Sequence, residues 1–208
     1  EAIEMARQVF EGNAVHYQGE CFSLHNAKLQ FDARPEIPIF IAGRGDKMLE
    51  QGGELADGVL LSGMAKSDLQ RACEHIRRGA SRAGRRPKIF YDVHLAFNET
   101  IVNCVRADYS FMIIDSPAHI QRELGLSEDQ IEQMRTVMIS DGLEAAGQLV
   151  SAEMLSHFIM IGDEETCALR LGEMMKRYAF DVFTLPIPPL KNPAELVLQA
   201  AAITQKAR

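Results

Sequence analysis

Short apolar runs alternate with helical periodicity along most of this chain. Continuous apolar runs bounded by proline or glycine predict strands at 38–43, 58–62, 89–97 and 181–185. The segments between them place apolar residues every three to four positions, which predicts helices. Strands that alternate with helices indicate βαβ units, and so an α/β fold with a parallel sheet. The first strand shows no polar alternation, so we expect it to be buried on both faces.

A helix and a hairpin precede the first of these strands. Ile3, Val9 and Phe10 follow a helical pattern from the start of the chain, which is typical of a chain cut from a longer protein. Residues 16–24 form two extended pieces around a glycine turn, which predicts a surface hairpin. The residues expected to cap later helices are Asp46, Ser67, Ser116 or Ser127, Asp163, and Asn192 followed by Pro193.

The number and spacing of the strands suggest an architecture. Four strands are too few to close a barrel, and they fit half of a TIM-type (β/α)8 barrel with a helical insertion. We expect a single partial domain over 1–208, with a leading helix and hairpin at 1–37, three βα strands at 38–98, a helical insertion at 99–157, and a last βα unit with a closing helix at 158–208. A doubly wound sheet is the alternative, weakened because no G-x-G-x-x-G motif follows the first strand.

Composition narrows the class of protein. The 208 residues are 47% hydrophobic and 25% charged, as in an ordinary globular domain. A net charge of −7 would repel a nucleic-acid backbone, so nucleic acid is a poor partner. No apolar run approaches the roughly 18 to 20 residues of a membrane span, and no secretory signal opens the chain. We therefore expect a cytoplasmic protein without a membrane partner.

Cysteine and histidine spacing suggests neither a metal nor a disulfide framework. The cysteines form no CxxC pair and the histidines no HExxH motif, so we expect no metal site. His94 on the third predicted strand could carry a proton, but a hydrogen-bonded core histidine fits it better. We expect the basic residues within 77–86 to lie on a solvated helix face.

The ends of the first two predicted strands carry the candidate chemistry. The first strand ends in Gly43-Arg44-Gly45 and turns into a helix, which presents backbone N–H groups and the positive end of a helix dipole to an anion. Arg44 and Lys47 can add charge-assisted hydrogen bonds, although a plain turn with both side chains solvated is the structural alternative. Ser62 and Gly63 end the second strand, where barrel enzymes bind substrate.

Residues 38–61 carry a resemblance to a known family. They read PIFIAGRGDKMLEQGGELADGVLL, similar to the pattern P-I-x-I-A-x-x-G-x-K-x-L-x-x-A-G-E-x-A-D-G-V-L of the luciferase-like monooxygenases. Within that family the segment resembles methylenetetrahydromethanopterin reductase-like proteins, which use the deazaflavin coenzyme F420. Weaker collinear matches lie at 10–12, 17–22, 150–154 and 158–162. The resemblance places the chain on strands five to eight of the barrel, with roughly the first hundred residues of the family pattern absent.

The resemblance also implies a function. It implies a flavoprotein-type oxidoreductase that transfers a hydride between coenzyme F420 or FMN and a small organic substrate. The residues expected to contact the cofactor are Ala42, Gly43, Arg44, Gly45, Lys47 and Met48. Related sequences often have Gly and Pro where this chain has Arg44 and Asp46, and the Asp46 carboxylate would repel a phosphate unless it is turned away. Family members place acid–base residues on early strands, so we expect the catalytic residues to lie outside this chain.

A second hypothesis needs no catalysis. Four unclosed strands expose two sheet edges and an apolar face, which favours pairing with another chain. The chain could then be a non-catalytic flavin-binding or dimerising half-barrel module. Under either hypothesis we expect a homodimer.

Overall fold

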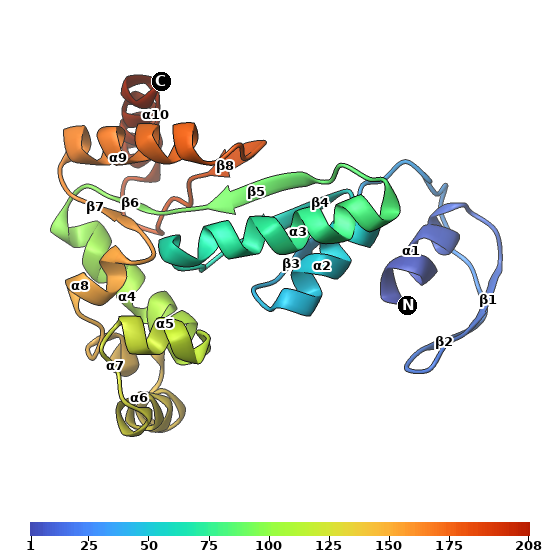
Figure 1. The fold of residues 1–208 in the computed structure, drawn as a ribbon, viewed down its shortest axis with the longest axis horizontal. Helices are drawn as coiled ribbons and strands as arrows, with labels where there is room; N and C mark the ends of the chain where they lie inside the picture. The colour runs from blue at the N-terminus through green and yellow to red at the C-terminus, as the bar shows by residue number, and fades with distance from the viewer. The chain divides into compact units, whose positions relative to one another are not determined.

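The computed structural model describes residues 1–208, and the chain forms two compact units (Figure 1). Unit 1 comprises Glu1–Val59 and Glu74–Lys88, and unit 2 comprises Leu60–Cys73 and Ile89–Arg208. Strands and helices alternate in both, so the fold is α/β with a parallel sheet. The four strands of the main sheet follow the order β3-β4-β5-β8.

Unit 1 begins with the predicted helix and hairpin. Helix α1 spans Ala2–Phe10, and strands β1 (Val15–Gln18) and β2 (Ser23–Ala27) pair antiparallel. The Glu1 carboxylate accepts hydrogen bonds of 2.8 to 3.1 Å from the backbone N–H groups of residues 20–22. The hairpin turn is therefore held against the start of α1, and both sequence predictions are confirmed.

The next element is the first strand of the main sheet, and it is less buried than predicted. Strand β3 covers only Phe40–Ala42, and Phe40 is 46% exposed. The expectation that this strand is buried on both faces is wrong for the chain as described. The physical reason is that β3 is an edge strand of the sheet, and Phe40 and Ala42, which alternate onto the same face, are both exposed.

Helix α2 and the C-terminal part of α3 form the helical layer of unit 1. Helix α2 spans Asp46–Leu55, and α3 spans Leu69–Ala83. The two backbones approach so closely that a Cβ on Gly79 would overlap the Glu50 carbonyl, and one on Gly53 would overlap the Ile76 carbonyl. Glycine is therefore required at both positions by packing rather than by backbone conformation.

A charged cluster joins the same two helices. The Glu50 carboxylate accepts from Arg78 and Arg82, each at 2.9 Å, and lies 2.9 Å from His75 Nδ1. The His75 hydrogen bond, followed by that of Arg82, lowers the pKa of Glu50 to about 2. The basic residues at 77–86 were predicted on a solvated face, and Arg78 and Arg82 are exposed there while also pairing with α2.

Unit 2 contains the parallel pairs. Strand β4 (Gly58–Leu61) enters it at Leu60, and β5 (Lys88–Asp92) pairs in parallel with β8 (Val182–Thr184). The segment 89–97, predicted as one strand, divides after Asp92, because β6 (Leu95–Ala96) leaves the main sheet to pair with β7 (Met160–Ile161). The sequence reasoning missed β7, a two-residue strand too short to show a pattern.

Helices make up most of unit 2. They are the 3-10 turn Lys66–Asp68, α4 (Glu99–Ile114), α5 (Ala118–Glu123), α6 (Glu128–Asp141), α7 (Leu143–Gly147), α8 (Ala152–Ser156), α9 (Glu164–Arg177) and α10 (Pro193–Ala207). Helices α4, α5, α6 and α8 contribute residues to one apolar core that includes Tyr109, Ile113, Leu155 and Phe158. No helix of the structure combines the length and the apolar character of a membrane span.

Several predicted helix caps are confirmed, and others are wrong. Asp163 accepts from the Thr166 N–H at 2.8 Å, and Ser127 forms a full capping box with Gln130. Asp46 does not cap α2, because Gly45 occupies that position. Ser67 is not a cap either, and its hydroxyl donates to Glu123. Of the alternatives Ser116 and Ser127, the second is the cap, while the Ser116 hydroxyl donates to the Met112 carbonyl. Asn192 is the N-cap of α10 with Pro193 after it, as predicted, although its side chain makes no bond to the helix backbone.

Candidate functional site

The turn between β3 and α2 in unit 1 has the geometry of an anion-binding site. Gly45 is extended (φ −79°, ψ 145°) and its carbonyl accepts the first helical bond, from the Leu49 N–H at 2.9 Å. The N–H groups of the first turn precede that bond, so they have no partner within the helix. A Cβ at Gly45 would meet no atom within 4 Å. The corner is therefore open at the point where backbone donors and the helix dipole converge.

Met48 folds back over Gly43 beside this open point. A Cβ on Gly43 would overlap the Met48 side chain, which is itself 46% exposed. Lys47 is exposed and Arg44 is half-buried. Residues 42–48 thus form one continuous corner with a soft apolar wall on one side and cationic side chains nearby.

Asp46, the residue that most opposes an anion here, is directed toward α3. Its Oδ1 lies 3.5 Å from His75 Nε2, and its side chain is 53% exposed. The other ring nitrogen of His75 is 2.9 Å from Glu50 Oε1. The Asp46 and Glu50 carboxylates therefore lie on either side of the His75 ring.

The second predicted group lies at the strand ends of unit 2. The Ser62 hydroxyl donates to Asp92 Oδ2 at 2.8 Å, and the Thr184 hydroxyl donates to Asp92 Oδ1 at 3.1 Å. Three polar side chains thus meet where β4, β5 and β8 end. Gly63 adopts φ +60°, and a Cβ there would overlap the Met112 side chain. Sequence reasoning missed Asp92 and Thr184, although each is the last, polar residue of a strand.

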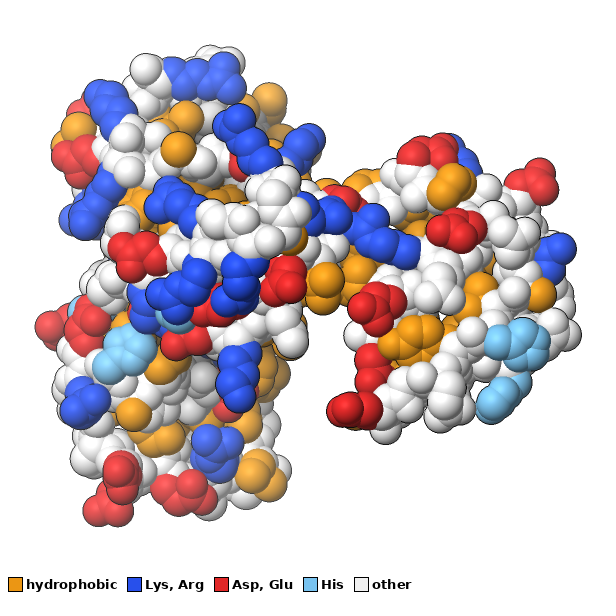
Figure 2. Space-filling view, turned by 45° about the vertical axis from the view of Figure 1, so that its right-hand side comes forward, with side chains coloured by type: hydrophobic (Ala, Val, Ile, Leu, Met, Phe, Trp, Pro, Cys, Tyr) orange, Lys and Arg blue, Asp and Glu red, His pale blue; other side chains and the backbone are white.

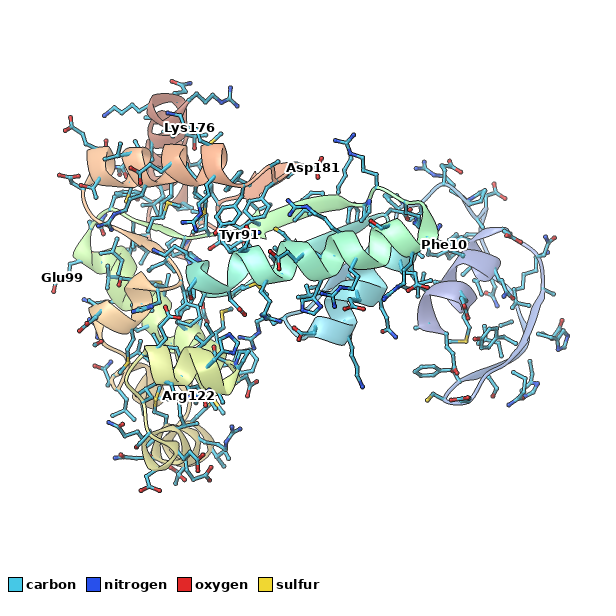
Figure 3. The ribbon with its side chains drawn as sticks, in the orientation of Figure 1. Phe10, Tyr91, Glu99, Arg122, Lys176 and Asp181 are labelled. Atoms are coloured by element: carbon cyan, nitrogen blue, oxygen red, sulfur yellow. The ribbon has the colours of Figure 1, made fainter.

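His94 follows β5 and proves to be a satisfied interior histidine. Its Nδ1 lies 3.2 Å from the Tyr109 hydroxyl, with the two rings edge to face. Burial lowers the pKa of His94 and so favours the neutral ring. Tyr91 on β5 (Figure 3) is likewise enclosed. Its ring centroid lies 5.4 Å from that of Phe180 and 6.2 Å from that of Phe183. The sequence reading that favoured a core histidine is confirmed.

A family model identifies the class of protein that this fold represents. The model of the luciferase-like monooxygenases matches residues 1–181, well over half of the sequence. The chain belongs to the luciferase-like monooxygenase family, as the segment 38–61 indicated.

Individual relatives are more specific. The chain is 32% identical over 203 residues to the 5,10-methylenetetrahydromethanopterin reductase of Archaeoglobus fulgidus, a match that covers 92% of this chain and 61% of the relative. It is 28% identical over 211 residues to the enzyme of the same name from Methanopyrus kandleri, covering 96% of this chain and 60% of the relative. The chain therefore spans about three fifths of the length of these relatives.

Solved structures agree with the sequence relatives. The coenzyme F420 dependent tetrahydromethanopterin reductase of Methanopyrus kandleri superposes with a TM-score of 0.73 at 25% identity, over 93% of this chain and 59% of that one. An F420-dependent secondary alcohol dehydrogenase, in complex with an F420-acetone adduct, superposes with a TM-score of 0.69 at 17% identity, over 100% of this chain and 60% of that one. The second likeness supports the fold alone.

Proposed function

We propose that this chain is the C-terminal, cofactor-holding part of an F420-dependent oxidoreductase similar to 5,10-methylenetetrahydromethanopterin reductase. The reaction would be hydride transfer between the deazaflavin and a small organic substrate. Two kinds of finding support it: the names of the relatives above and the open corner at residues 42–48. FMN is the alternative cofactor, and the likeness to the F420-dependent reductase of Methanopyrus kandleri favours the deazaflavin.

The same reasoning extends to the architecture. We infer that β3, β4, β5 and β8 are strands five to eight of a (β/α)8 barrel, with 99–157 as a helical insertion and 1–37 as a leading segment of one partial domain. The sequential strand order and the longer relatives support this inference. In such barrels, ligands bind at the carboxyl ends of the strands, and residues 42–48 and Ser62 both follow strand ends.

The open position at Gly45 carries the proposal. A phosphate oxygen there can accept first-turn N–H groups, while Lys47 and Arg44 supply positive charge and Met48 covers the corner. When bound, the deazaflavin supplies the hydride acceptor or donor carbon, and the chain's part is to position and shield it. At the strand ends of unit 2, Ser62 and Gly63 are proposed substrate contacts, with Asp92 fixing the direction of the Ser62 hydroxyl.

A dimerising module without catalysis remains the second candidate, because one observation favours it. Phe40, on edge strand β3, exposes 46% of its surface, and an open apolar edge is a template for pairing with another chain. A homodimer is proposed in either case. Cofactor titration separates the two ideas, because a module that only dimerises binds no cofactor, and analytical ultracentrifugation of Phe40→Lys tests whether edge strand β3 forms the dimer interface.

Substitution of Gly45 tests the proposed cofactor-binding site. Asp and Asn are both good N-caps, so Gly45→Asp and Gly45→Asn are each expected to keep α2 intact. Only the carboxylate repels a phosphate, so we expect Gly45→Asp to weaken coenzyme F420 binding about tenfold or more relative to Gly45→Asn. Fluorescence titration gives the affinities, and circular dichroism checks the helix.

The contrary results are equally clear. Equal affinities of the two Gly45 variants for coenzyme F420 would place the phosphate elsewhere. An unchanged affinity in the double variant Arg44→Ala, Lys47→Ala would remove those side chains from the proposed site. Parallel titration with FMN decides which cofactor the corner prefers.

A further inference from the structure

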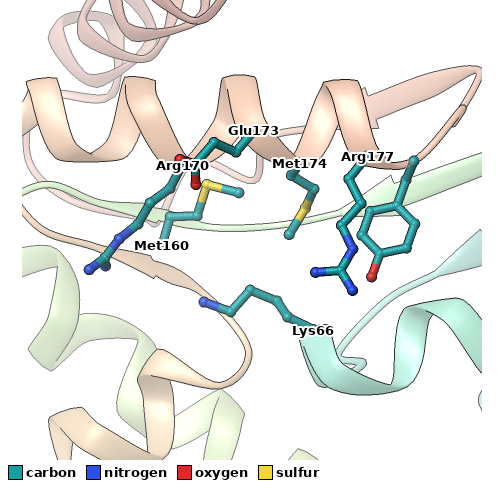
Figure 4. Close-up of a pocket in the computed structure, with 7 residues that line it drawn as sticks. Lys66, Met160, Arg170, Glu173, Met174 and Arg177 are labelled. Atoms are coloured by element: carbon teal, nitrogen blue, oxygen red, sulfur yellow. The ribbon is translucent and has the colours of Figure 1, made fainter.

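A basic pocket lies in unit 2 between the start of the 3-10 turn and helix α9 (Figure 4). Its volume is about 290 Å³, near the lower end for sites of small ligands. Its lining contains none of the residues assigned to the cofactor or the substrate; it consists of Lys66, Met160, Arg170, Glu173, Met174, Arg177 and Tyr178.

Helical spacing brings most of these side chains together. Arg170, Met174 and Arg177 stand at i, i+4 and i+7 on α9, so they share one helix face. Lys66 approaches that face from the other side, and Met160 of β7 lies between them (Figure 4). The pocket therefore combines three cations and one carboxylate, Glu173, with an apolar floor.

The three cations have no strong acidic partner among their contacts. Lys66 Nζ donates to the Ile159 carbonyl at 3.0 Å, and Arg170 donates to the Ile161 carbonyl. The Arg177 guanidinium stacks over the Tyr178 ring at 5.4 Å. Burial, and next the nearby charge of Arg170, lower the pKa of Lys66. Positive charge is thus concentrated at a partly desolvated point, where an anion would relieve the repulsion.

The arrangement favours a phosphate over a single carboxylate. Two guanidiniums from α9 and the Lys66 ammonium from the opposite side line the pocket, which suits a doubly charged, tetrahedral group with several acceptor oxygens. Met160, Met174 and the Tyr178 ring offer contact to an apolar body attached to it. Basic side chains also gather over the part of unit 2 that carries α9 and α10 (Figure 2), which attracts an anion from solution.

We propose that this pocket is a second ligand site, which binds a small phosphate ester with an apolar or aromatic body. The site goes beyond the proposed oxidoreductase function and does not depend on it. Phenyl phosphate is a suitable probe, with inorganic phosphate and phenol as its charged and apolar halves.

Methionine methyl NMR on the full chain tests the proposal. With 13C-methyl methionine, we expect phenyl phosphate to shift the signals of Met160 and Met174, assigned through Met160→Leu and Met174→Leu, at lower concentration than either half-probe. Arg177→Gln and Lys66→Met remove one charge each and are expected to weaken binding about tenfold. Lys176→Gln is the matched control, because Lys176 is an exposed cation on α9 outside the pocket lining (Figure 3).

Each possible result either supports or overturns the proposed phosphate-ester site. Shifts that weaken in Arg177→Gln but persist in Lys176→Gln support the site, and Arg177→Gln gives this answer even if Lys66→Met fails to fold. The proposal is overturned if the two methyl signals do not move, if Arg177→Gln binds as tightly as the unaltered chain, or if Lys176→Gln weakens binding equally.

Discussion

Replacement of Gly79 by valine is expected to destabilise unit 1 by about 3 kcal/mol, the upper end of overpacking costs. The new side chain would enter the space occupied by the Glu50 carbonyl, which is backbone and cannot rotate away. Helices α2 and α3 would have to separate, and the Glu50 ion pairs with Arg78 and Arg82 would lengthen. Urea unfolding followed by circular dichroism measures the loss.

Ser81→Val is the matched control for this substitution. Ser81 is exposed on the same helix, so the variant introduces the same β-branched side chain without overpacking. Its cost should stay within about 0.5 kcal/mol. Equal destabilisation by Gly79→Val and Ser81→Val would show that helix propensity, rather than the close approach of α2, accounts for the effect.

Loss of the Asp57 carboxylate has the second large expected effect. It accepts from the Ile39 N–H and from Arg85, both at 2.8 Å, and from Arg7 at 3.1 Å. These bonds connect α1, the entry to β3 and the end of α3 around the turn that follows α2. We expect Asp57→Ala to destabilise unit 1 by about 2 kcal/mol, because three charge-assisted bonds are lost at a partly exposed position.

The pH dependence of stability is an independent test of the role of the Asp57 carboxylate. Partial burial by itself raises its pKa, but the Ile39 N–H, Arg7 and Arg85 outweigh burial, and the pKa is lowered. A lowered folded-state pKa gives stability that is present above about pH 4 and lost as the pH falls through the folded value. The stability difference between the unaltered chain and Asp57→Asn should therefore shrink on acidification.

Glu54→Gln controls for surface charge in that comparison. Glu54 makes an exposed 3.5 Å pair with Arg82, which contributes little. If Glu54→Gln and Asp57→Asn show the same pH profile between neutral pH and acid, general surface electrostatics would explain it and the specific role of Asp57 would be refuted.

Much of the proposed anion-binding site could be predicted from the sequence, because its features are local. A strand that ends in Gly43-Arg44-Gly45 and continues into a helix places backbone donors at a corner whatever else surrounds it. The family pattern over 38–61 is equally local and was confirmed by the family match. The role of Asp46 was misjudged, because its partner His75 lies on another helix and sequence spacing does not show it.

Periodicity, turn residues and one continuous motif determined by themselves the α/β class, most helices and strands, the family and the place of the proposed anion site. Only the tertiary structure decided which distant side chains meet: Asp92 with Ser62 and Thr184, Gly79 with Glu50, and Lys66 with the cationic face of α9. The reason is physical. Local patterns express backbone geometry over a few residues, whereas these contacts join residues far apart in the chain, and packing of the elements alone sets their distances.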